Sequence, residues 1–165
     1  GYTGDISGGV VTVEAAAVTG VTVSGTVKSY GGETENVTVT LTPENGTPMT
    51  TVVTGNSAAY KFENVSAGTY TLKVEKKGHA PWTESITVGS TAVAKDVTVY
   101  LWGDVNRDGK VNGTDALWIR QSSAGGRTLD AYQKVLADLN RDGKVNGTDA
   151  LWIRQISAGS RTLTY

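Results

Sequence analysis

The chain has 165 residues, which is enough for one ordinary domain or two small ones. Only 38% of the residues are hydrophobic, the formal net charge is −1 and there is no cysteine, so a basic nucleic-acid or membrane-surface footprint and any thiol or disulfide chemistry are excluded. No apolar run is long enough to insert in a membrane, and a single histidine, His79, leaves a zinc site or a histidine-based triad without partners, so we expect no enzyme.

Residues 1–16 are rich in glycine at first and then apolar, which indicates a linker or a leading strand. The start has no basic region followed by an apolar stretch, so no signal peptide is expected there. The sequence looks like a fragment from the end of a longer protein.

Residues 17–101 alternate apolar and polar residues in six or seven short runs that are rich in valine and threonine. The breaks between the runs hold Gly, Pro, Asn or Ser. This spacing predicts an all-β, immunoglobulin-like sandwich of antiparallel strands. Tyr60 and Phe62 alternate, as do Tyr70 and Leu72, so these side chains should face the core.

After a boundary at about residues 101/102, the pattern changes to clusters of Asp, Asn and Gly, each followed by a helix-length segment. Residues 102–165 therefore form a second, small all-α domain with repeats at about 104–125 and 138–159. Between the repeats, apolar spacing over 129–139 predicts another helix, with Thr128 as its N-cap. Gly125 and Gly159 are the expected stops of the two repeated helices.

The stretch NRDGKVNGTDALWIRQ occupies residues 106–121 and recurs unchanged at 140–155. Each copy contains most of a 12-residue loop with oxygen-bearing side chains at positions 1, 3, 5, 9 and 12 and glycine at position 6. This is the EF-hand pattern, and calcium, a hard cation, prefers such oxygen ligands. Position 7 would contribute a backbone carbonyl. The sequence predicts two Ca²⁺ ions, bound by Asp104, Asn106, Asp108, Lys110, Asn112 and Asp115 and by Asp138, Asn140, Asp142, Lys144, Asn146 and Asp149.

Position 12 of each loop is Asp rather than the usual Glu, so its carboxylate reaches less far toward the ion. The alternative is that both loops are solvated Asx turns without a metal, because Asp, Asn and Gly are ordinary loop residues. Two loops with every ligand position in register favour calcium.

The repeats GDVNRDGKVNGTDALWIRQ and DLNRDGKVNGTDALWIRQ resemble a dockerin, the module that plugs cellulosomal subunits into cohesins. The resemblance covers about 102–165 and implies a secreted, extracellular module with two calcium ions, monomeric on its own, in a bacterial cell-surface complex. The implied partner is a cohesin of a scaffoldin or a cell-surface anchoring protein. VSGTVKS and AYKFENVSAGTYTLKVEKKGH in the preceding half resemble X modules and carboxypeptidase-regulatory-like domains.

One stripe of each repeated helix corresponds to the surface that meets the cohesin in dockerins, and helical spacing places its members together. These residues are Gly113, Thr114, Leu117, Trp118 and Gln121 and their equivalents Gly147, Thr148, Leu151, Trp152 and Gln155. A second stripe, with Ala116, Ile119 and Ser123, suits packing against the partner helix. Two identical faces would let one partner bind in either of two orientations, as many dockerins do.

Three alternatives stay open. Trp118 and Trp152 could be core residues of a small helical domain, with the identity of the copies reflecting recent duplication. The chain could be a calcium-stabilised structural or adhesive fragment that binds no cohesin. Trp82 could stack on a sugar, which would make the β half a carbohydrate-binding module.

Overall fold

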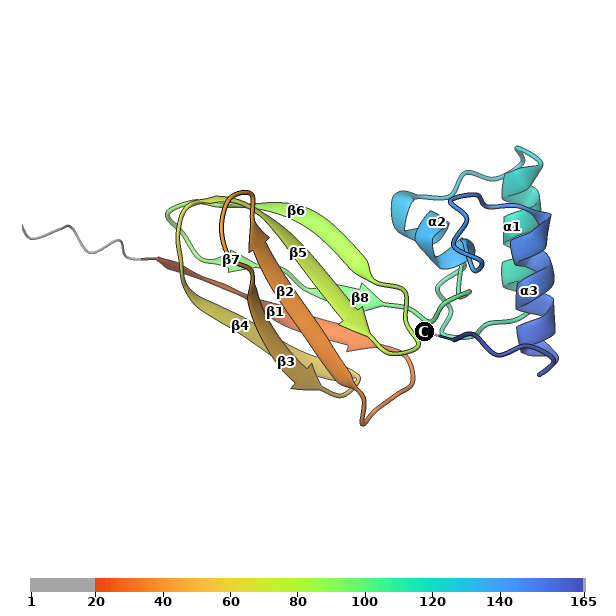
Figure 1. The fold of residues 1–165 in the computed structure, drawn as a ribbon, viewed down its shortest axis with the longest axis horizontal. Helices are drawn as coiled ribbons and strands as arrows, with labels where there is room; N and C mark the ends of the chain where they lie inside the picture. The colour runs from red at the N-terminus through yellow and green to blue at the C-terminus, as the bar shows by residue number, and fades with distance from the viewer. Residues whose placement is uncertain (1–19, 165) are drawn as a thin grey trace, which may run out of the picture.

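The computed structural model describes residues 20–164, and the predicted linker or strand at 1–16 lies outside them. A β-sandwich and a compact group of three helices lie next to each other along the long axis of the molecule (Figure 1). Each part has its own cluster of buried apolar side chains. Among the described residues no helix has the length and apolar character needed to cross a membrane.

The first sheet is built around β1 (Val21–Ser29). On one side β1 pairs antiparallel with β4 (Ser57–Val65), and on the other it pairs with β7 (Val93–Ala94) and β8 (Val97–Val99). Both of these last pairings are parallel, so the prediction of a wholly antiparallel sandwich was wrong. Alternation fixes which face of a strand is buried but carries no information on its direction.

The second sheet contains β3 (Met49–Thr54), β2 (Asn36–Pro43), β5 (Gly68–Lys76) and β6 (Trp82–Val88) in that order. All neighbours in it run antiparallel. This sheet faces the first one across the sandwich core (Figure 1).

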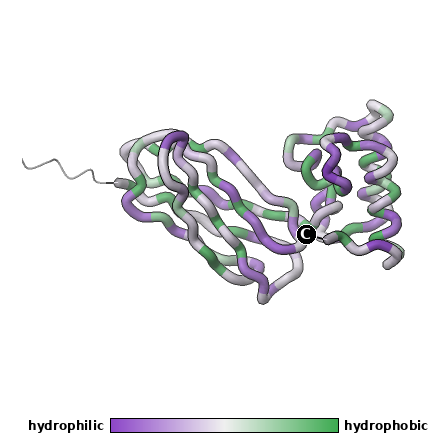
Figure 2. Tube along the Cα trace, viewed as in Figure 1, coloured by the Kyte–Doolittle hydropathy of each residue, from purple (hydrophilic) through white to green (hydrophobic). Residues whose placement is uncertain are grey.

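The sandwich core consists of the inward residues of both sheets. Tyr60, Phe62, Tyr70 and Leu72 are all buried, which confirms the predicted alternation. Hydrophobic and hydrophilic residues mix along the strands (Figure 2). Valine and threonine fit this half-buried, pleated environment, which explains their abundance in the sandwich.

The helical part contains α1 (Gly113–Ser123), α2 (Ala131–Ala137) and α3 (Gly147–Ser157). Each repeated helix is followed by a glycine with positive φ, Gly125 at 77° and Gly159 at 71°, which confirms the predicted stops. The N-cap of α2 is Asp130 rather than the predicted Thr128. Asp130 forms a capping box with Gln133 that satisfies two backbone N–H groups, so the helix starts after Asp130 and not after Thr128.

Helices α1 and α3 lie side by side (Figure 1). Ala116 and Ile119 of α1 are buried in one cluster with Ala150 and Ile153 of α3, as the second helical stripe predicts. Ser123, which was expected on that stripe, is exposed at the end of α1.

The two parts meet where β8 leads into the first loop. Leu101 forms a β-bridge with His79, and the hydroxyl of Tyr132 in α2 donates to the carbonyl of Ala80 at 2.8 Å. His79 is buried at this junction. Its two ring nitrogens lie 2.9 Å from the Lys77 carbonyl oxygen and 2.7 Å from that of Tyr30.

Candidate functional site

The first loop, residues 104–115, is closed by two carboxylates. Asp104 accepts hydrogen bonds from the backbone N–H of Asp108 at 3.0 Å and of Gly109 at 2.9 Å. At the other end of the loop, Asp115 accepts from the N–H groups of Asn106 at 3.1 Å and Asn112 at 2.9 Å. The loop therefore folds around its own acidic side chains.

The second loop, residues 138–149, repeats this pattern. Asp138 accepts from the N–H groups of Asp142 at 3.1 Å and Gly143 at 2.9 Å. Asp149 accepts from Asn146 at 2.9 Å and also from Leu139 at 3.0 Å.

Local backbone chemistry explains why these sequences form tight loops. Gly109 and Gly143, at position 6, have φ values of 85° and 80°, a region that favours glycine. Asn112 and Asn146, at position 9, cap α1 and α3, because their side chains accept from the N–H of the second helical residue at 2.8 Å. These two predicted ligands therefore also start the helices.

The remaining predicted ligands occupy the turns of the loops. Asn106 accepts from the Asp108 N–H through Oδ1 and donates to the Asp108 carboxylate through Nδ2, and Asn140 does the same with Asp142. Lys110 and Lys144 donate their backbone N–H groups to Asp108 and Asp142 respectively, both at 2.9 Å, and their side chains are exposed. Each loop thus brings its six predicted residues into one hydrogen-bonded unit.

Three of the loop carboxylates, Asp104, Asp115 and Asp149, are fully buried. Burial raises the pKa of Asp104 to about 6 and also raises the pKa values of Asp115 and Asp149, against the lowering effect of their backbone hydrogen bonds. Among the described residues no lysine or arginine forms an ion pair with any of the three. A buried carboxylate without a positive partner is costly, so this donor set fits a hard cation.

Within residues 20–164, no three Asp, Glu or His side chains converge closely enough to hold a metal ion by themselves. The predicted ligand sets differ from such a cluster because each mixes three carboxylates with asparagine oxygens and a backbone carbonyl. The two calcium sites therefore remain a prediction.

The predicted partner-binding stripes lie on the outer surfaces of α1 and α3. Leu117 is 50% exposed and Leu151 is 52% exposed, unusually high fractions for large apolar side chains at equivalent positions. The small residues preceding them on the same stripes, Gly113, Thr114, Gly147 and Thr148, are also exposed.

Trp118 and Trp152 are half-buried and pack against the helical core, so part of each ring serves packing. The guanidinium of Arg127 lies 3.7 Å from the centre of the Trp118 ring, and that of Arg161 lies 3.9 Å from the centre of the Trp152 ring. The core alternative for the tryptophans thus holds in part.

The same two arginines engage the predicted face residues Gln121 and Gln155. Arg127 donates to Gln121 at 2.9 Å, and Arg161 donates to Gln155 at 2.7 Å. Sequence reasoning missed both arginines. The signal was present, because Arg-Thr-Leu occurs at 127–129 and again at 161–163, with the same offset as the loops.

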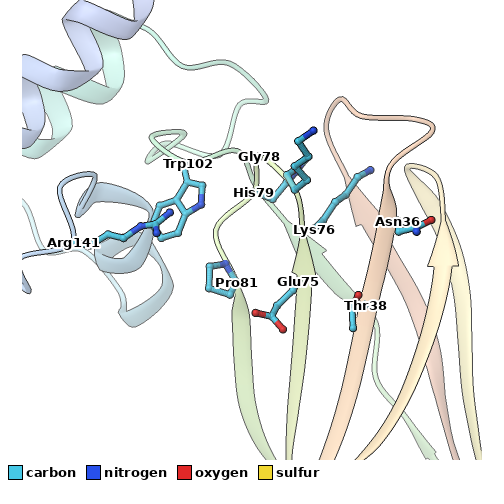
Figure 3. A pocket seen from close by; sticks show the side chains of 10 residues that line it. Asn36, Thr38, Glu75, Lys76, Gly78, His79, Pro81, Trp102 and Arg141 are labelled. Carbon is cyan, nitrogen blue, oxygen red and sulfur yellow. The ribbon is translucent and has the colours of Figure 1, made fainter. Parts of the chain in front are cut away.

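A pocket of about 490 Å³ lies at the junction of the two parts (Figure 3). Trp102 and Arg141 border it on the helical side, and Lys76 and Glu75 on the sandwich side. The guanidinium of Arg141 lies 4.9 Å from the centre of the Trp102 ring.

Two family models match the chain. Residues 22–101 match the carboxypeptidase regulatory-like domain, and residues 102–156 match the dockerin type I domain. Both are non-catalytic modules. No match was found among curated proteins.

Solved structures show more distant likeness. A type II cohesin–X–dockerin complex from Acetivibrio cellulolyticus with an N-terminal interface mutation is 24% identical, with a TM-score of 0.40, over 81% of this chain and 93% of that chain. A candidate carbohydrate-binding protein from Bacteroides uniformis is 20% identical, with a TM-score of 0.38, over 50% of this chain. The present chain spans 42% of the length of that Bacteroides protein. The 5-hydroxyisourate hydrolase of Klebsiella pneumoniae is 20% identical, with a TM-score of 0.39, over 49% of this chain and 90% of that chain.

The loops, the exposed helical stripes and the two family matches agree with one another. The chain carries a dockerin type I domain at residues 102–156, preceded by a carboxypeptidase regulatory-like domain at residues 22–101.

Proposed function

We propose that this chain is a calcium-dependent attachment module that binds a cohesin and so joins its parent protein to a cellulosome-type complex outside the bacterial cell. The carrying observation is the pair of exposed leucines, Leu117 and Leu151, at equivalent positions of two identical helices in a dockerin type I domain. Apolar side chains half open to water on a small domain are suited to burial against a protein partner.

Calcium would be held by the six predicted residues of each loop, and its charge would balance the carboxylates. In the apo state the buried Asp104, Asp115 and Asp149 carry an unfavourable charge in a poorly hydrated site. Their neutralisation would stabilise the loops, and with them the first turns of α1 and α3, which start at the loop residues Asn112 and Asn146.

Each helix would present one face to the cohesin, and only one face would be used at a time. The support is that Thr114 and Leu117 are exposed on α1 at the same positions of the repeat as Thr148 and Leu151 on α3. A cohesin that recognises this pattern could bind in two orientations, one for each copy of the repeat.

The sandwich would act as a platform for this module. Trp82, the residue behind the carbohydrate-binding alternative, packs partly against the sandwich core, and Lys95 lies over its ring at 5.6 Å. Part of its aromatic surface is therefore covered within the chain, and the sugar-binding alternative gains no support from its position.

The proposal is tested by calorimetric titration of the 165-residue chain against cohesins of different types, first in calcium and then in excess chelator. We expect tight binding to one class of cohesin, and its loss in chelator. If calcium is taken up but every cohesin fails to bind, the attachment function is wrong and the calcium-stabilised structural alternative holds.

A further inference from the structure

We propose that the sandwich and α2 together brace the first loop, so that loop 104–115 is the tighter calcium site and loop 138–149 the weaker one, although nearly all of their residues are the same. This inference rests on the calcium binding proposed above. It concerns a difference in calcium affinity between two loops whose sequences are nearly the same.

The first contact of the brace is made by Tyr30, which follows β1. A Cβ atom at Gly109 would come within 2.9 Å of the Tyr30 ring, so the ring packs directly on the loop backbone. Tyr30 is itself stacked on Tyr100, with ring centres 5.4 Å apart. At the equivalent Gly143 of the second loop, no heavy atom of the described residues lies within 4 Å of such a Cβ position.

The second contact is made by Arg107, at position 4 of the first loop. Its guanidinium lies 5.8 Å from the centre of the Tyr100 ring and 5.5 Å from that of Tyr132, and it forms an ion pair of 2.6 Å with Asp130. The equivalent Arg141 is exposed, and the aromatic ring it approaches is that of Trp102. One residue type at one loop position therefore has two different environments.

The third contact reaches the peptide backbone of the first loop. The side-chain amide of Gln133 in α2 donates to the carbonyl of Val105 at 3.0 Å. The first ligand, Asp104, is fully buried, whereas its counterpart Asp138 is partly open to solvent. The first loop is thus held by β-sandwich and α2 residues on several sides.

Holding a loop in its folded form before the ion arrives lowers the ordering cost of binding. Removing water from the first ligand also strengthens its attraction to a cation. The second loop has no counterpart of the Tyr30 contact among the described residues, so more of its ordering cost falls on the binding step. We expect the first loop to be half-saturated at a calcium concentration about tenfold lower, the ratio that corresponds to ordering one or two side chains in advance.

The test is a calcium chloride titration of the chelator-treated, ¹⁵N-labelled 165-residue chain, with the amide signals of Gly109 and Gly143 followed by NMR. These glycines report the two loops separately. In the wild-type chain the Gly109 signal should shift to its bound position first.

Two variants, each with its own control, isolate the brace. Tyr30→Ala should weaken binding at Gly109 and leave Gly143 unchanged, whereas Val52→Ala, a truncation at another exposed site of the sandwich, should leave both midpoints in place. Arg107→Gln and Arg141→Gln form a matched pair. Arg107→Gln should weaken calcium binding at the first loop more than Arg141→Gln weakens calcium binding at the second loop.

Equal midpoints, or an earlier shift at Gly143, would overturn the brace while leaving calcium binding intact. If neither signal responds to calcium, the proposed calcium dependence fails as well. A Tyr30→Ala chain that keeps the wild-type difference would also contradict the inference.

Discussion

Arg127 covers Trp118 of α1, with its guanidinium carbon 3.7 Å from the centre of the indole ring. The Nε of Arg127 also donates to Gln121, which lies about one turn after Trp118 in α1. A charged group over an aromatic ring is favourable, and the hydrogen bond fixes the guanidinium in place. The same arrangement holds Trp152 under Arg161. On each predicted binding face, the Trp and Gln side chains are therefore held in place by an arginine before any partner binds.

Replacing Arg127 should loosen this arrangement. Arg127→Gln removes the cation–π contact and alters the bond to Gln121, so we expect the free energy of unfolding of the helical part to fall by about 1 kcal/mol. Urea denaturation followed by tryptophan fluorescence measures this loss. Arg120→Gln is the control, because it removes the same charge from an exposed position of α1. Equal losses in both variants would contradict the role of Arg127.

The two faces should substitute for each other in binding. Leu117→Ala alone should lower the association constant for a cohesin by about twofold, since one of two equal orientations is lost. Leu117→Ala with Leu151→Ala should lower it by about 30-fold or more, the scale of a lost hot spot. Calorimetry measures both, with Val135→Ala on exposed α2 surface as the control. If Leu117→Ala alone lowers the association constant as much as the double variant does, only one face is used.

The hydroxyl of Tyr132 should stabilise the junction. It accepts from the Tyr100 N–H at 3.2 Å and donates to the Ala80 carbonyl at 2.8 Å. Tyr132→Phe leaves both groups without this partner, and we expect a loss of about 1–2 kcal/mol. Amide hydrogen exchange should show faster exchange in α2 and unchanged exchange in β5.

Tyr70→Phe is the matched control for this prediction, because the Tyr70 hydroxyl donates to Ser66 within the sandwich. It should speed exchange in the strands and leave α2 unchanged. If Tyr132→Phe also leaves α2 unchanged, the hydroxyl does not tie the two parts together.

Stability should fall at high pH through Tyr60. Burial, and secondarily the charge of Asp96, raises the pKa of Tyr60 to about 12. An unfolded tyrosine loses its proton at about pH 10. Between these values the unfolded state binds fewer protons than the folded state, so the free energy of unfolding decreases as the pH rises from about 10 to 12.

Denaturant midpoints measured across that range test the effect. Tyr60→Phe, which cannot ionise, should show a shallower decrease than the wild-type chain. Parallel curves for the two proteins would mean that Tyr60 does not carry the pH dependence.

Much of the fold followed from local sequence signals. The inward positions of Tyr60 and Phe62 are set by strand alternation, and the ends of α1 and α3 at Gly125 and Gly159 are set by glycine's access to positive φ. Such signals depend on neighbours in sequence. The capping box of Asp130 and Gln133 was also readable in this way, as an Asp followed three residues later by a Gln.

Contacts between distant segments could not be predicted in the same way. Arg107 and Arg141 belong to identical stretches, so no local pattern distinguishes them, yet one lies against Tyr132 and the other against Trp102. The burial of His79 has the same origin, since it depends on the Leu101 bridge. The symmetry of the repeated sequence is broken here by residues outside the two repeats, Tyr132 of α2 and Trp102.

The parallel pairing of β1 with β8 has a mechanical consequence. Val27 is paired with Val97 and Ser29 with Val99, and the chain leaves β8 directly for the dockerin domain. A pull between the N-terminal end of β1 and the dockerin would act along these two strands in opposite directions. Their hydrogen bonds lie across that direction, so they would be sheared together rather than opened one after another. A pull along this line therefore meets all of the β1–β8 hydrogen bonds at once.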